Sequence, residues 1–310
     1  MTRIVVTEFM DDAAVAALAA RFAVRYDAGL VDRPAELVAE LGDAEALVVR
    51  NRTQVNPTLL DAGPRLRVVG RLGVGLDNID VAACAARNVQ VIPATGANAQ
   101  AVAEYVIAAA MALMRGLVAV TPAVAAGQWP RAALSQGREI AGKTLGVIGF
   151  GGIGRLTARL ARALGMTVIG FDAHLAADAA AWREEEVSAH PFAEVLASAD
   201  VLTLHVPLTA ATRNLLDAAR IAAMKPEAIL VNTARGGVVD EAALAAALRA
   251  GRLGGAALDV FDHEPLAAGS PLAGCPNLLL TPHVAGVTRE ANARVSALIA
   301  ARVAAVLDRG

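Results

Sequence analysis

Three short polar segments hold most of the side chains that could carry out chemistry in this sequence. They are residues 232–237 (NTARGG), 259–265 (DVFDHEP) and 281–286 (TPHVAG), and each follows an apolar run typical of a buried strand. Ligands of an open parallel sheet bind beyond the carboxyl ends of its strands, so we expect the three segments to lie at a ligand site. They supply a guanidinium, carboxylates and imidazoles. A guanidinium binds carboxylates well, and an imidazole can transfer protons near neutral pH.

A glycine-rich turn stands between two further predicted strands, at residues 144–148 and 167–171. Gly149 permits a tight turn, Gly151 allows the backbone to approach a pyrophosphate, and Gly154 allows the following helix to pack closely against the strand. The first N–H groups of that helix have no partners within it and can bind phosphates. The stretch therefore predicts a dinucleotide site, and the alternative is an ordinary turn between a strand and a helix. The side chains of this helix expected to face the core are Leu156, Leu160, Ala163 and Leu164.

Asp172 ends the second of these strands, about twenty residues beyond the first glycine. A carboxylate at this place can accept hydrogen bonds from the hydroxyl groups of a ribose, and it would repel the 2′-phosphate of NADP. The sequence therefore favours NAD as the cofactor. His174 is close enough to leave NADP as the alternative.

The length of the chain, 310 residues, predicts two domains. Strand and helix patterns alternate through residues 4–92, as in a parallel α/β domain, and one long helix at residues 99–120 leads out of it. A final amphipathic helix at residues 288–307 is expected to return to the first domain. We therefore predict an α/β fold of two doubly wound parallel-sheet domains, with a Rossmann NAD-binding domain (residues 99–286) inserted into a flavodoxin-like substrate domain (residues 1–98 and 287–310).

Composition and charge argue against several other classes of protein. Aromatic residues make up 3% of the chain and the net charge is −2 with no basic block, so nucleic acid is not an expected partner. The most apolar stretch, residues 101–120, contains Glu104 and Arg115, so no membrane span is expected. The N-terminal segment becomes acidic too early for a signal peptide. Cys84 and Cys275 lack metal-ligand spacing, so we expect no metal site and a cytoplasmic location.

Several motifs in a fixed order give the sequence a resemblance to a known family. They are residues 71–80 (RLGVGLDNID), 149–154 (GFGGIG), 205–209 (HVPLT), 232–240 (NTARGGVVD), 257–265 (ALDVFDHEP) and 281–286 (TPHVAG). The chain resembles the D-2-hydroxyacid dehydrogenases, NAD-dependent oxidoreductases that include 3-phosphoglycerate dehydrogenases. The resemblance implies hydride transfer between NAD(H) and a small anionic 2-hydroxy or 2-oxo acid. It also implies a homodimer with the helix from Ala99 at the interface.

The resemblance implies a catalytic set of Arg235, Glu264 and His283. His283 would donate the proton to the carbonyl oxygen, Glu264 would orient the imidazole and favour its charged form, and Arg235 would hold the substrate carboxylate. Taken singly, each residue has an ordinary alternative: a surface cation, an acid at a helix start, or a loop histidine. His263 is a rival base that the family pattern does not require, while His174 and His190 are expected at the surface.

The remaining expected contacts divide between cofactor and substrate. The residues expected to contact the cofactor are Gly149, Gly151, Gly152, Ile153, Gly154, Asp172, His205, Val206, Pro207, Thr233, Ala234, Arg235, Asp259, His283 and Gly286. Backbone N–H groups of Val74 and Gly75 could bind the substrate carboxylate from the other domain. Arg50 and Arg71 match positions that touch the distal anion in phosphoglycerate dehydrogenases, and Arg131 resembles an arginine supplied by the neighbouring subunit. Arg52 is an additional cation; Arg52 and Arg131 have the alternative of being ordinary surface charges.

A second anionic group on the substrate would suit such an arginine cluster. Residues 49–55 (VRNRTQV), 93–98 (PATGAN) and 281–288 (TPHVAGVT) are similar to bacterial sulfolactate dehydrogenases, so sulfolactate and 3-phosphoglycerate both remain open as substrates. An alternative from another class is an NAD-sensing binding protein without turnover, like the corepressors that share this fold. Formate dehydrogenase chemistry is disfavoured because it needs no acid–base pair and Glu264 is present.

Overall fold

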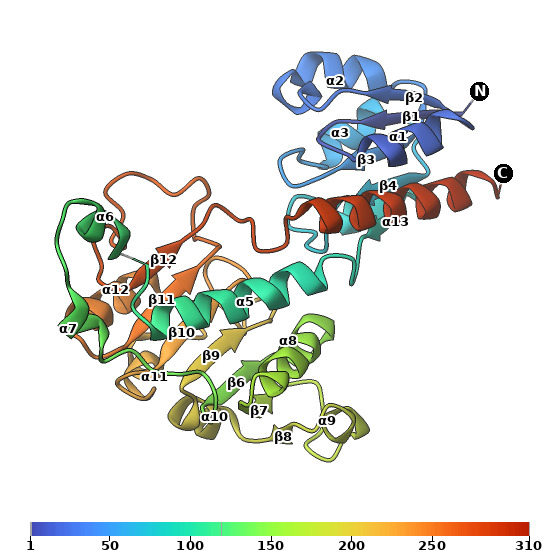
Figure 1. Cartoon of the computed structure of the whole chain (residues 1–310). Helices are drawn as coiled ribbons and strands as arrows, with labels where there is room; N and C mark the ends of the chain where they lie inside the picture. Colours follow the sequence, from blue (N-terminus) through green and yellow to red (C-terminus); the bar gives the residue numbers. More distant parts are fainter. Residues whose placement is uncertain (1, 119, 310) are drawn as a thin grey trace. The chain divides into compact units, whose positions relative to one another are not determined.

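The computed structural model describes residues 2–118 and 120–309 (Figure 1). The chain divides into two compact units, one formed by Met1–Asn98 with Val287–Gly310 and the other by Ala99–Gly286. Each unit contains one sheet, and every strand pair within the two sheets is parallel. Two parallel-sheet α/β units are the fold class that the sequence predicted, and this prediction is confirmed.

The first unit has a five-stranded sheet with helices on both faces. Its strands, in pairing order, are β2 (Ala23–Tyr26), β1 (Arg3–Val6), β3 (Ala44–Val49), β4 (Val68–Arg71) and β5 (Gln90–Pro93). One face packs against α1 (Asp12–Ala19) and α13 (Arg289–Leu307). The other packs against α2 (Pro34–Leu41), α3 (Pro57–Ala62) and α4 (Val81–Ala86), with a short 3₁₀ turn η1 (Leu30–Asp32) before α2. The last helix of the chain therefore completes the core of the first unit, as Figure 1 shows in red.

The second unit has a seven-stranded sheet, also covered on both faces. Its strands, in pairing order, are β12 (Leu278–Leu280), β11 (Gly255–Leu258), β10 (Ile229–Asn232), β9 (Val201–Leu204), β6 (Thr144–Ile148), β7 (Thr167–Phe171) and β8 (Ser188–Ala189). Helices α5 (Ala99–Met114), α8 (Gly152–Ala163) and α9 (Ala180–Glu184) cover one face. Helices α10 (Phe192–Ser198), α11 (Ala218–Ala222) and α12 (Glu241–Arg249) cover the other.

The expected single helix over residues 99–120 is interrupted, so that prediction was wrong. Helix α5 ends at Met114, and α6 (Val120–Ala125) and α7 (Arg131–Leu134) follow as separate short helices; Ala119 lies outside the described residues. Gly116 has a φ of +64°, its N–H donates to the Leu113 carbonyl at 3.1 Å, and the N–H of residue 117 donates to the carbonyl of residue 112 at 2.9 Å. This is a glycine C-cap of the Schellman type, in which the left-handed residue ends the helix.

The inward face of α8 also differs from the expected one. Its buried residues are Gly154, Thr157, Ala158 and Ala161, whereas Leu164 is 40% exposed. Helix α8 packs against β6, β7 and the neighbouring helix α5. Small side chains allow the backbones to approach closely, so they are the fully buried residues of the contact, while Leu160 packs against the same core and is only partly buried.

The described residues contain neither a membrane-spanning helix nor a cluster of metal ligands. No helix within the described ranges is long and apolar enough to cross a membrane. Among the same residues, no group of three or more His, Cys, Asp or Glu side chains is arranged to hold a metal ion. Cys84 and Cys275 are both free thiols.

Candidate active site

The carboxyl ends of three adjacent strands bring the three polar segments of the second unit to one edge of its sheet. Strand β10 ends at Asn232, β11 at Leu258 and β12 at Leu280, and the strands pair in that order. Each polar segment begins directly after its strand. Parallel pairing therefore gathers residues that are distant in sequence, as the rule for open α/β sheets requires.

The imidazole of His283 and the carboxylate of Glu264 form a hydrogen-bonded pair. His283 Nδ1 lies 2.7 Å from Glu264 Oε2, and Glu264 Oε1 accepts the N–H of Phe261 at 3.1 Å. The His283 side chain is 39% exposed. Because Nδ1 is engaged by Glu264, Nε2 is the ring atom left for proton exchange with a ligand.

The surroundings of Glu264 favour its ionised form. Partial burial raises the pKa of this carboxyl, but the hydrogen bond from His283, the charge of that ring, the Phe261 N–H and the nearby Arg235 charge lower it more. The net result is a pKa below the ordinary value of 4.5. The carboxylate is therefore charged at neutral pH and can accept a hydrogen bond from the His283 ring.

Arg235 lies half-buried in the loop after β10. Its Nη1 donates to the Ala234 carbonyl at 2.6 Å, and Asn232 braces the loop by accepting the Ala234 N–H and donating to the Arg235 carbonyl, both at 3.0 Å. Gly236 packs so closely on the Phe261 carbonyl that a Cβ would overlap it. The loops of Arg235 and Glu264 are thus in direct contact, which agrees with the influence of Arg235 on the Glu264 carboxyl.

Asp259 holds the loop that carries His283. This carboxylate is 1% exposed, and it accepts the Thr281 hydroxyl at 2.6 Å and the N–H groups of Val284 and Ala285 at 2.8 Å each. Its carbonyl accepts the His283 N–H at 2.8 Å, and His283 is held at a left-handed φ of 57°. The sequence suggested a cofactor contact for Asp259, whereas these contacts order the histidine loop.

A hydroxyl pair that the sequence analysis missed extends this network. The Tyr105 hydroxyl, from α5, lies 2.6 Å from the Thr281 hydroxyl, which in turn donates to Asp259. Tyr105 sits in an apolar helical pattern that gives no indication of a polar partner 176 residues away. Only the docking of α5 on the sheet reveals the contact.

The glycine turn has the geometry that a bound dinucleotide requires. Gly149 has a φ of +93°, and a Cβ there would lie 2.5 Å from the His205 carbonyl oxygen. A Cβ on Gly151 or Gly152 would meet nothing within 4 Å, and α8 begins at Gly152 with no side-chain cap. The backbone at Gly151 and Gly152 is therefore open to a ligand, and the first N–H groups of α8 have no side-chain cap, which fits a pyrophosphate.

Two polar groups at the carboxyl edge of the same sheet also fit NAD. Asp172 accepts the Phe150 N–H at 2.7 Å and the His174 N–H at 2.8 Å, so its carboxylate is fixed beside the turn. Thr233 Oγ1 is buried with no hydrogen-bond partner in the described part of the chain, and a bound cofactor could satisfy it. The expected cofactor contacts that lie on α8 or on the loops after β9, β10 and β12 are Ile153, Gly154, His205, Val206, Pro207, Ala234 and Gly286.

His205 is neutral at physiological pH. Burial lowers the pKa of its imidazole to about 4, and Nε2 lies 3.1 Å from the Thr203 hydroxyl. Such a ring can contact a cofactor but does not carry a proton at neutral pH, in agreement with the expectation that it does not serve in proton transfer.

The predicted substrate arginines of the first unit have different partners. Arg50 Nη2 donates to the Asn292 amide oxygen at 2.8 Å, and its guanidinium lies 5.7 Å from the centre of the Phe9 ring. Arg52 instead forms an exposed ion pair with Asp32. The Arg50 guanidinium is therefore held by a neutral amide in the described structure, whereas a carboxylate neutralises the charge of Arg52.

Arg71 and the loop after β4 form a second predicted substrate contact. The Arg71 guanidinium lies over Gly73, where it takes the space that a Cβ would need. Val74 and Gly75 follow in the same loop and are partly exposed. In the second unit, Arg131 is exposed at the start of α7.

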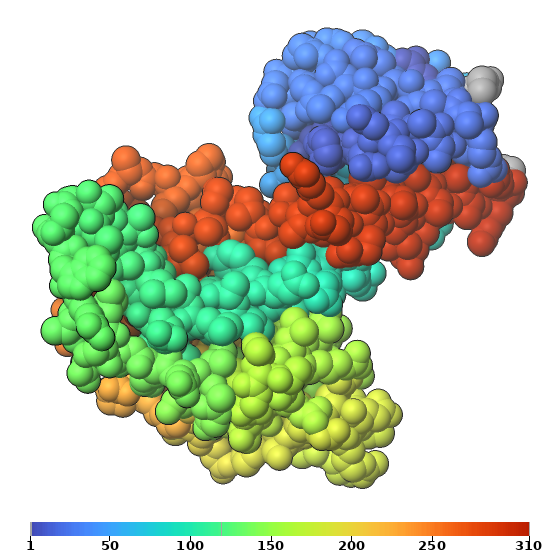
Figure 2. Space-filling view, in the orientation of Figure 1, coloured from blue at the N-terminus to red at the C-terminus, as the bar shows by residue number. Residues whose placement is uncertain are grey.

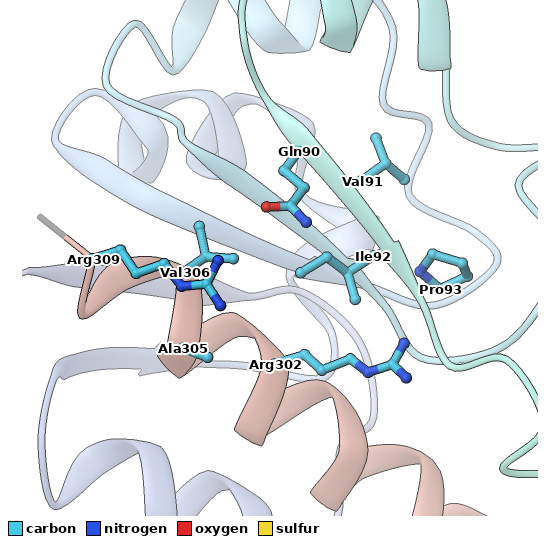
Figure 3. A pocket seen from close by; sticks show the side chains of 8 residues that line it. All are labelled: Gln90, Val91, Ile92, Pro93, Arg302, Ala305, Val306 and Arg309. Atoms are coloured by element: carbon cyan, nitrogen blue, oxygen red, sulfur yellow. The ribbon is translucent and has the colours of Figure 1, made fainter.

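A groove of about 350 Å³ in the first unit is separate from all these residues. It lies between β5 and the last turns of α13, with Arg302 and Arg309 beside it (Figure 3). None of the predicted catalytic, cofactor-binding or substrate-binding residues lines it.

The comparison with protein families decides the relationship that these motifs suggested. Residues 107–285 match the model of the D-isomer specific 2-hydroxyacid dehydrogenase, NAD binding domain, which covers more than half of the chain. The chain belongs to the D-isomer specific 2-hydroxyacid dehydrogenases. It is an NAD-dependent oxidoreductase, and its substrates are small 2-hydroxy or 2-oxo acids. The predicted family, enzyme class and cofactor are confirmed.

Relatives of this dehydrogenase differ in substrate and length. It is 53% identical over 296 residues to the (S)-sulfolactate dehydrogenase of Chromohalobacter salexigens, a match that covers 96% of this chain and 95% of the relative. It is 38% identical over 307 residues to the D-3-phosphoglycerate dehydrogenase of Methanocaldococcus jannaschii, a match that spans 99% of this chain but 58% of that relative.

Two solved structures share the fold of this chain. A glyoxylate reductase from Paecilomyes thermophila superposes with a TM-score of 0.88 at 28% identity, covering 100% of this chain and 96% of that one. A protein from Thermus thermophilus superposes with a TM-score of 0.90 at 34% identity, and the match covers 99% of this chain and 97% of that one.

Proposed function

We propose that this dehydrogenase interconverts (S)-sulfolactate and sulfopyruvate with NAD⁺ and NADH. The observation that carries the proposal is the 53% identity to a sulfolactate dehydrogenase over nearly the full length of both chains. The phosphoglycerate dehydrogenases reach 35–41% identity and extend well beyond the matched region. Both substrates carry a second anionic group, which agrees with a charged Arg50 side chain whose hydrogen-bond partner is a neutral amide.

The stereochemistry of this substrate agrees with a family specific for D-isomers. In D-lactate the carboxyl group ranks above the methyl group, and the descriptor is (R). In sulfolactate the carbon that bears sulfur ranks above the carboxyl group, so the same spatial arrangement receives the descriptor (S). An (S)-sulfolactate dehydrogenase therefore handles the spatial arrangement of a D-2-hydroxy acid.

The three catalytic candidates suit the reduction of a 2-oxo acid. Bound NADH supplies the hydride for the carbonyl carbon. His283 holds the transferable proton at Nε2, because Glu264 engages Nδ1. Glu264 keeps the ring oriented and, being ionised, favours its protonated form. Arg235 binds the substrate carboxylate with its planar fork.

The NAD preference is assigned to Asp172, and the pyrophosphate to the first turn of α8. The fixed carboxylate of Asp172 would accept the ribose hydroxyls and repel a 2′-phosphate. The remaining cofactor contacts stay as the sequence predicted, except that Asp259 acts through the loop of His283.

Arg50 and Arg71 are the first candidates to bind the distal anionic group of the substrate. The backbone N–H groups of Val74 and Gly75 would bind the substrate carboxylate. Arg52 contributes less, because Asp32 already neutralises it. Arg131 is retained as a contribution from the neighbouring subunit of a homodimer.

A homodimer with α5 at its interface, as the sequence predicted, would also cover an exposed apolar surface that follows α5 in the second unit. The segment from α6 to α7 forms a lobe at the surface of that unit (Figure 2). In and beside it, Leu117, Val124 and Trp129 are 50%, 43% and 79% exposed. Three large exposed apolar side chains in one short segment support an interface there. The free thiols of Cys84 and Cys275 support the cytoplasmic location that we also propose.

A substrate panel tests the proposal directly. NADH absorbance is followed with sulfopyruvate, 3-phosphohydroxypyruvate and pyruvate. We expect kcat/KM for sulfopyruvate to exceed that for the other two by at least roughly tenfold, the value of one well-placed contact. A preference for 3-phosphohydroxypyruvate would instead support the phosphoglycerate function that the archaeal and bacterial relatives suggest. Tight NADH binding without turnover of any acid would support an NAD sensor.

A further inference from the structure

The buried carboxylate of Glu8 binds four successive backbone N–H groups. Glu8 follows β1 directly after Thr7 and is 4% exposed. Its Oε1 accepts the N–H groups of Arg50 at 2.9 Å and Thr53 at 3.0 Å, and its Oε2 accepts those of Asn51 at 3.3 Å and Arg52 at 3.1 Å. The donors all belong to the loop after β3, so one side chain organises the backbone of that loop.

The carbonyl groups of the same loop are also bound. Asn78 Nδ2 donates to the Thr53 carbonyl at 2.7 Å and to the Arg50 carbonyl at 3.4 Å, and the hydroxyls of Thr53 and Thr7 lie 2.8 Å apart. Asn78 belongs to the loop after β4 that contains Val74 and Gly75. Both predicted anion-binding loops of the first unit are therefore tied to one polar cluster, which Glu8 anchors.

The chemistry of Glu8 fits a charged anchor. Burial raises the pKa of this carboxyl, but the N–H groups of Thr53, Arg50 and Arg52 and the Thr53 hydroxyl lower it more, to below the ordinary value of 4.5. In Glu8→Gln the side chain would keep one acceptor oxygen, and its NH2 group would be a donor that faces the N–H donors of the loop. The loop would have to move, because unsatisfied buried N–H groups are costly.

The anchored loop directs Arg50 away from the cluster. The backbone N–H of Arg50 points to Glu8, while its guanidinium reaches the Asn292 amide on α13 and the face of Phe9. The amide orients the guanidinium without neutralising it, and no ion pair of Arg50 is found within residues 2–118 and 120–309. Burial lowers the pKa of this guanidinium, and the charge of the nearby Glu8 carboxylate partly offsets that effect. A shift of the loop would move this charge with it.

We propose that Glu8 is a positioning residue that sets the placement of Arg50 and thereby the preference of the enzyme for substrates with a second anionic group. The proposal rests on the function proposed above for Arg50. Glu8 itself touches neither substrate nor cofactor. Its effect should therefore appear in the discrimination between a substrate with the second anion and the same substrate without it.

Sulfopyruvate and pyruvate form the required pair, since they differ by the sulfonate group. In Glu8→Gln we expect KM for sulfopyruvate to rise by roughly tenfold or more, with kcat and the Kd of NADH nearly unchanged, because only the binding of the distal group is weakened. The kcat/KM for pyruvate should stay within about threefold of the native value. An equal loss for both acids, or no change in their ratio, would overturn the proposal, because a general structural defect affects both alike.

Two control variants make the result specific. Glu45→Gln changes a partly buried glutamate in β3 that pairs with Arg67 at 3.2 Å, away from the loop of Arg50, so the sulfopyruvate to pyruvate ratio should stay constant. Arg50→Gln should reduce that ratio at least as much as Glu8→Gln. If Arg50→Gln leaves the ratio unchanged, the proposed function of Arg50 fails. If Arg50→Gln lowers it and Glu8→Gln does not, only the role of Glu8 fails.

Glu8→Asp covers the case in which Glu8→Gln does not fold. Aspartate keeps the charge but is one methylene shorter, so it can satisfy only part of the set of N–H groups. We expect a smaller loss of the sulfopyruvate to pyruvate ratio, roughly threefold, with the Kd of NADH unchanged. A folded Glu8→Asp enzyme with the native ratio would contradict the proposal.

Discussion

Glu264 Oε2 lies 2.7 Å from His283 Nδ1, although the two residues belong to loops that follow different strands. Strands β11 and β12 are neighbours in the sheet, and Asp259, at the end of β11, binds the backbone of the histidine loop. The pair is therefore preformed by hydrogen bonds within one unit. An imidazole that is oriented before substrate arrives loses less freedom in the reaction.

Replacement of His283 should remove proton transfer while the enzyme still binds NADH. For His283→Ala we expect kcat to fall by roughly 10²–10⁴-fold, the usual contribution of a positioned general acid. NADH fluorescence titration should still show binding, with a Kd within a few-fold of the native value, because His283 is one of many predicted cofactor contacts. The matched control is His190→Ala, since His190 also pairs with a glutamate, Glu194, at 3.1 Å on the surface. Near-native turnover of His283→Ala would exclude His283 as the proton donor.

Replacement of Glu264 should change the pH dependence of the reaction. In the native enzyme its pKa lies below 4.5, so the carboxylate remains charged through the neutral range and favours the protonated imidazole. Glu264→Gln removes this charge. The pH above which reduction slows should fall by roughly one unit for each 1.4 kcal/mol of interaction lost between the Glu264 charge and the protonated imidazole. Stopped-flow reduction rates measured from acid to alkaline pH would show the shift. If the decline of the rate at alkaline pH occurs at the same pH in Glu264→Gln and the native enzyme, the Glu264 charge does not have this role.

Asp172→Ala should weaken NAD binding and narrow the preference over NADP. The substitution removes both an acceptor for the ribose and the repulsion of a 2′-phosphate. It also removes the acceptor for the N–H groups of Phe150 and His174. Asp172→Asn loses the charge but keeps one of the two oxygens that accept these N–H groups, so it disturbs the backbone less than Asp172→Ala. The measurement is kcat/KM for each cofactor, and an unchanged ratio in both variants would assign discrimination to another residue.

Tyr105→Phe should destabilise the second unit while catalysis continues. It removes one side-chain hydrogen bond, to Thr281, which contributes about 1 kcal/mol of unfolding free energy. Thr281→Val should cost more, because it also takes a donor from the buried Asp259. Urea unfolding of the single and double variants gives the coupling between the two hydroxyls. Additive losses would mean that the Tyr105–Thr281 contact is not energetically significant.

Glu8 should make the stability of the first unit depend on pH in the acid range. Its folded-state pKa is lower than the ordinary 4.5, so its contribution is complete above about pH 5 and is lost as pH falls through the folded value. The stability difference between the native chain and Glu8→Gln should therefore be constant at neutral pH and shrink below pH 4.5. Thermal unfolding from neutral to acid pH measures this difference. A stability difference that grows on acidification would contradict a lowered pKa of Glu8 in the folded state.

Local sequence patterns were sufficient where the structure depends on neighbouring residues. The strand patterns at residues 229–232 and 278–280 coincide with β10 and β12. Asp240 caps α12 and Thr288 caps α13. The glycine turn after β6 has the conformation that its spacing predicts. These features follow from backbone conformation and capping, which a few adjacent residues determine.

Tertiary structure decided the partners of the side chains. The pairing of β10, β11 and β12 placed Arg235, Glu264 and His283 in three neighbouring loops, and the docking of α8 selected small residues over its leucines as the buried face. It also brought Arg52 into an ion pair with Asp32 and placed the Asp259 carboxylate against the backbone of the histidine loop. A local pattern specifies how the chain bends, but a contact between distant residues depends on which elements pack together, and the order of strands in the sheet determines this.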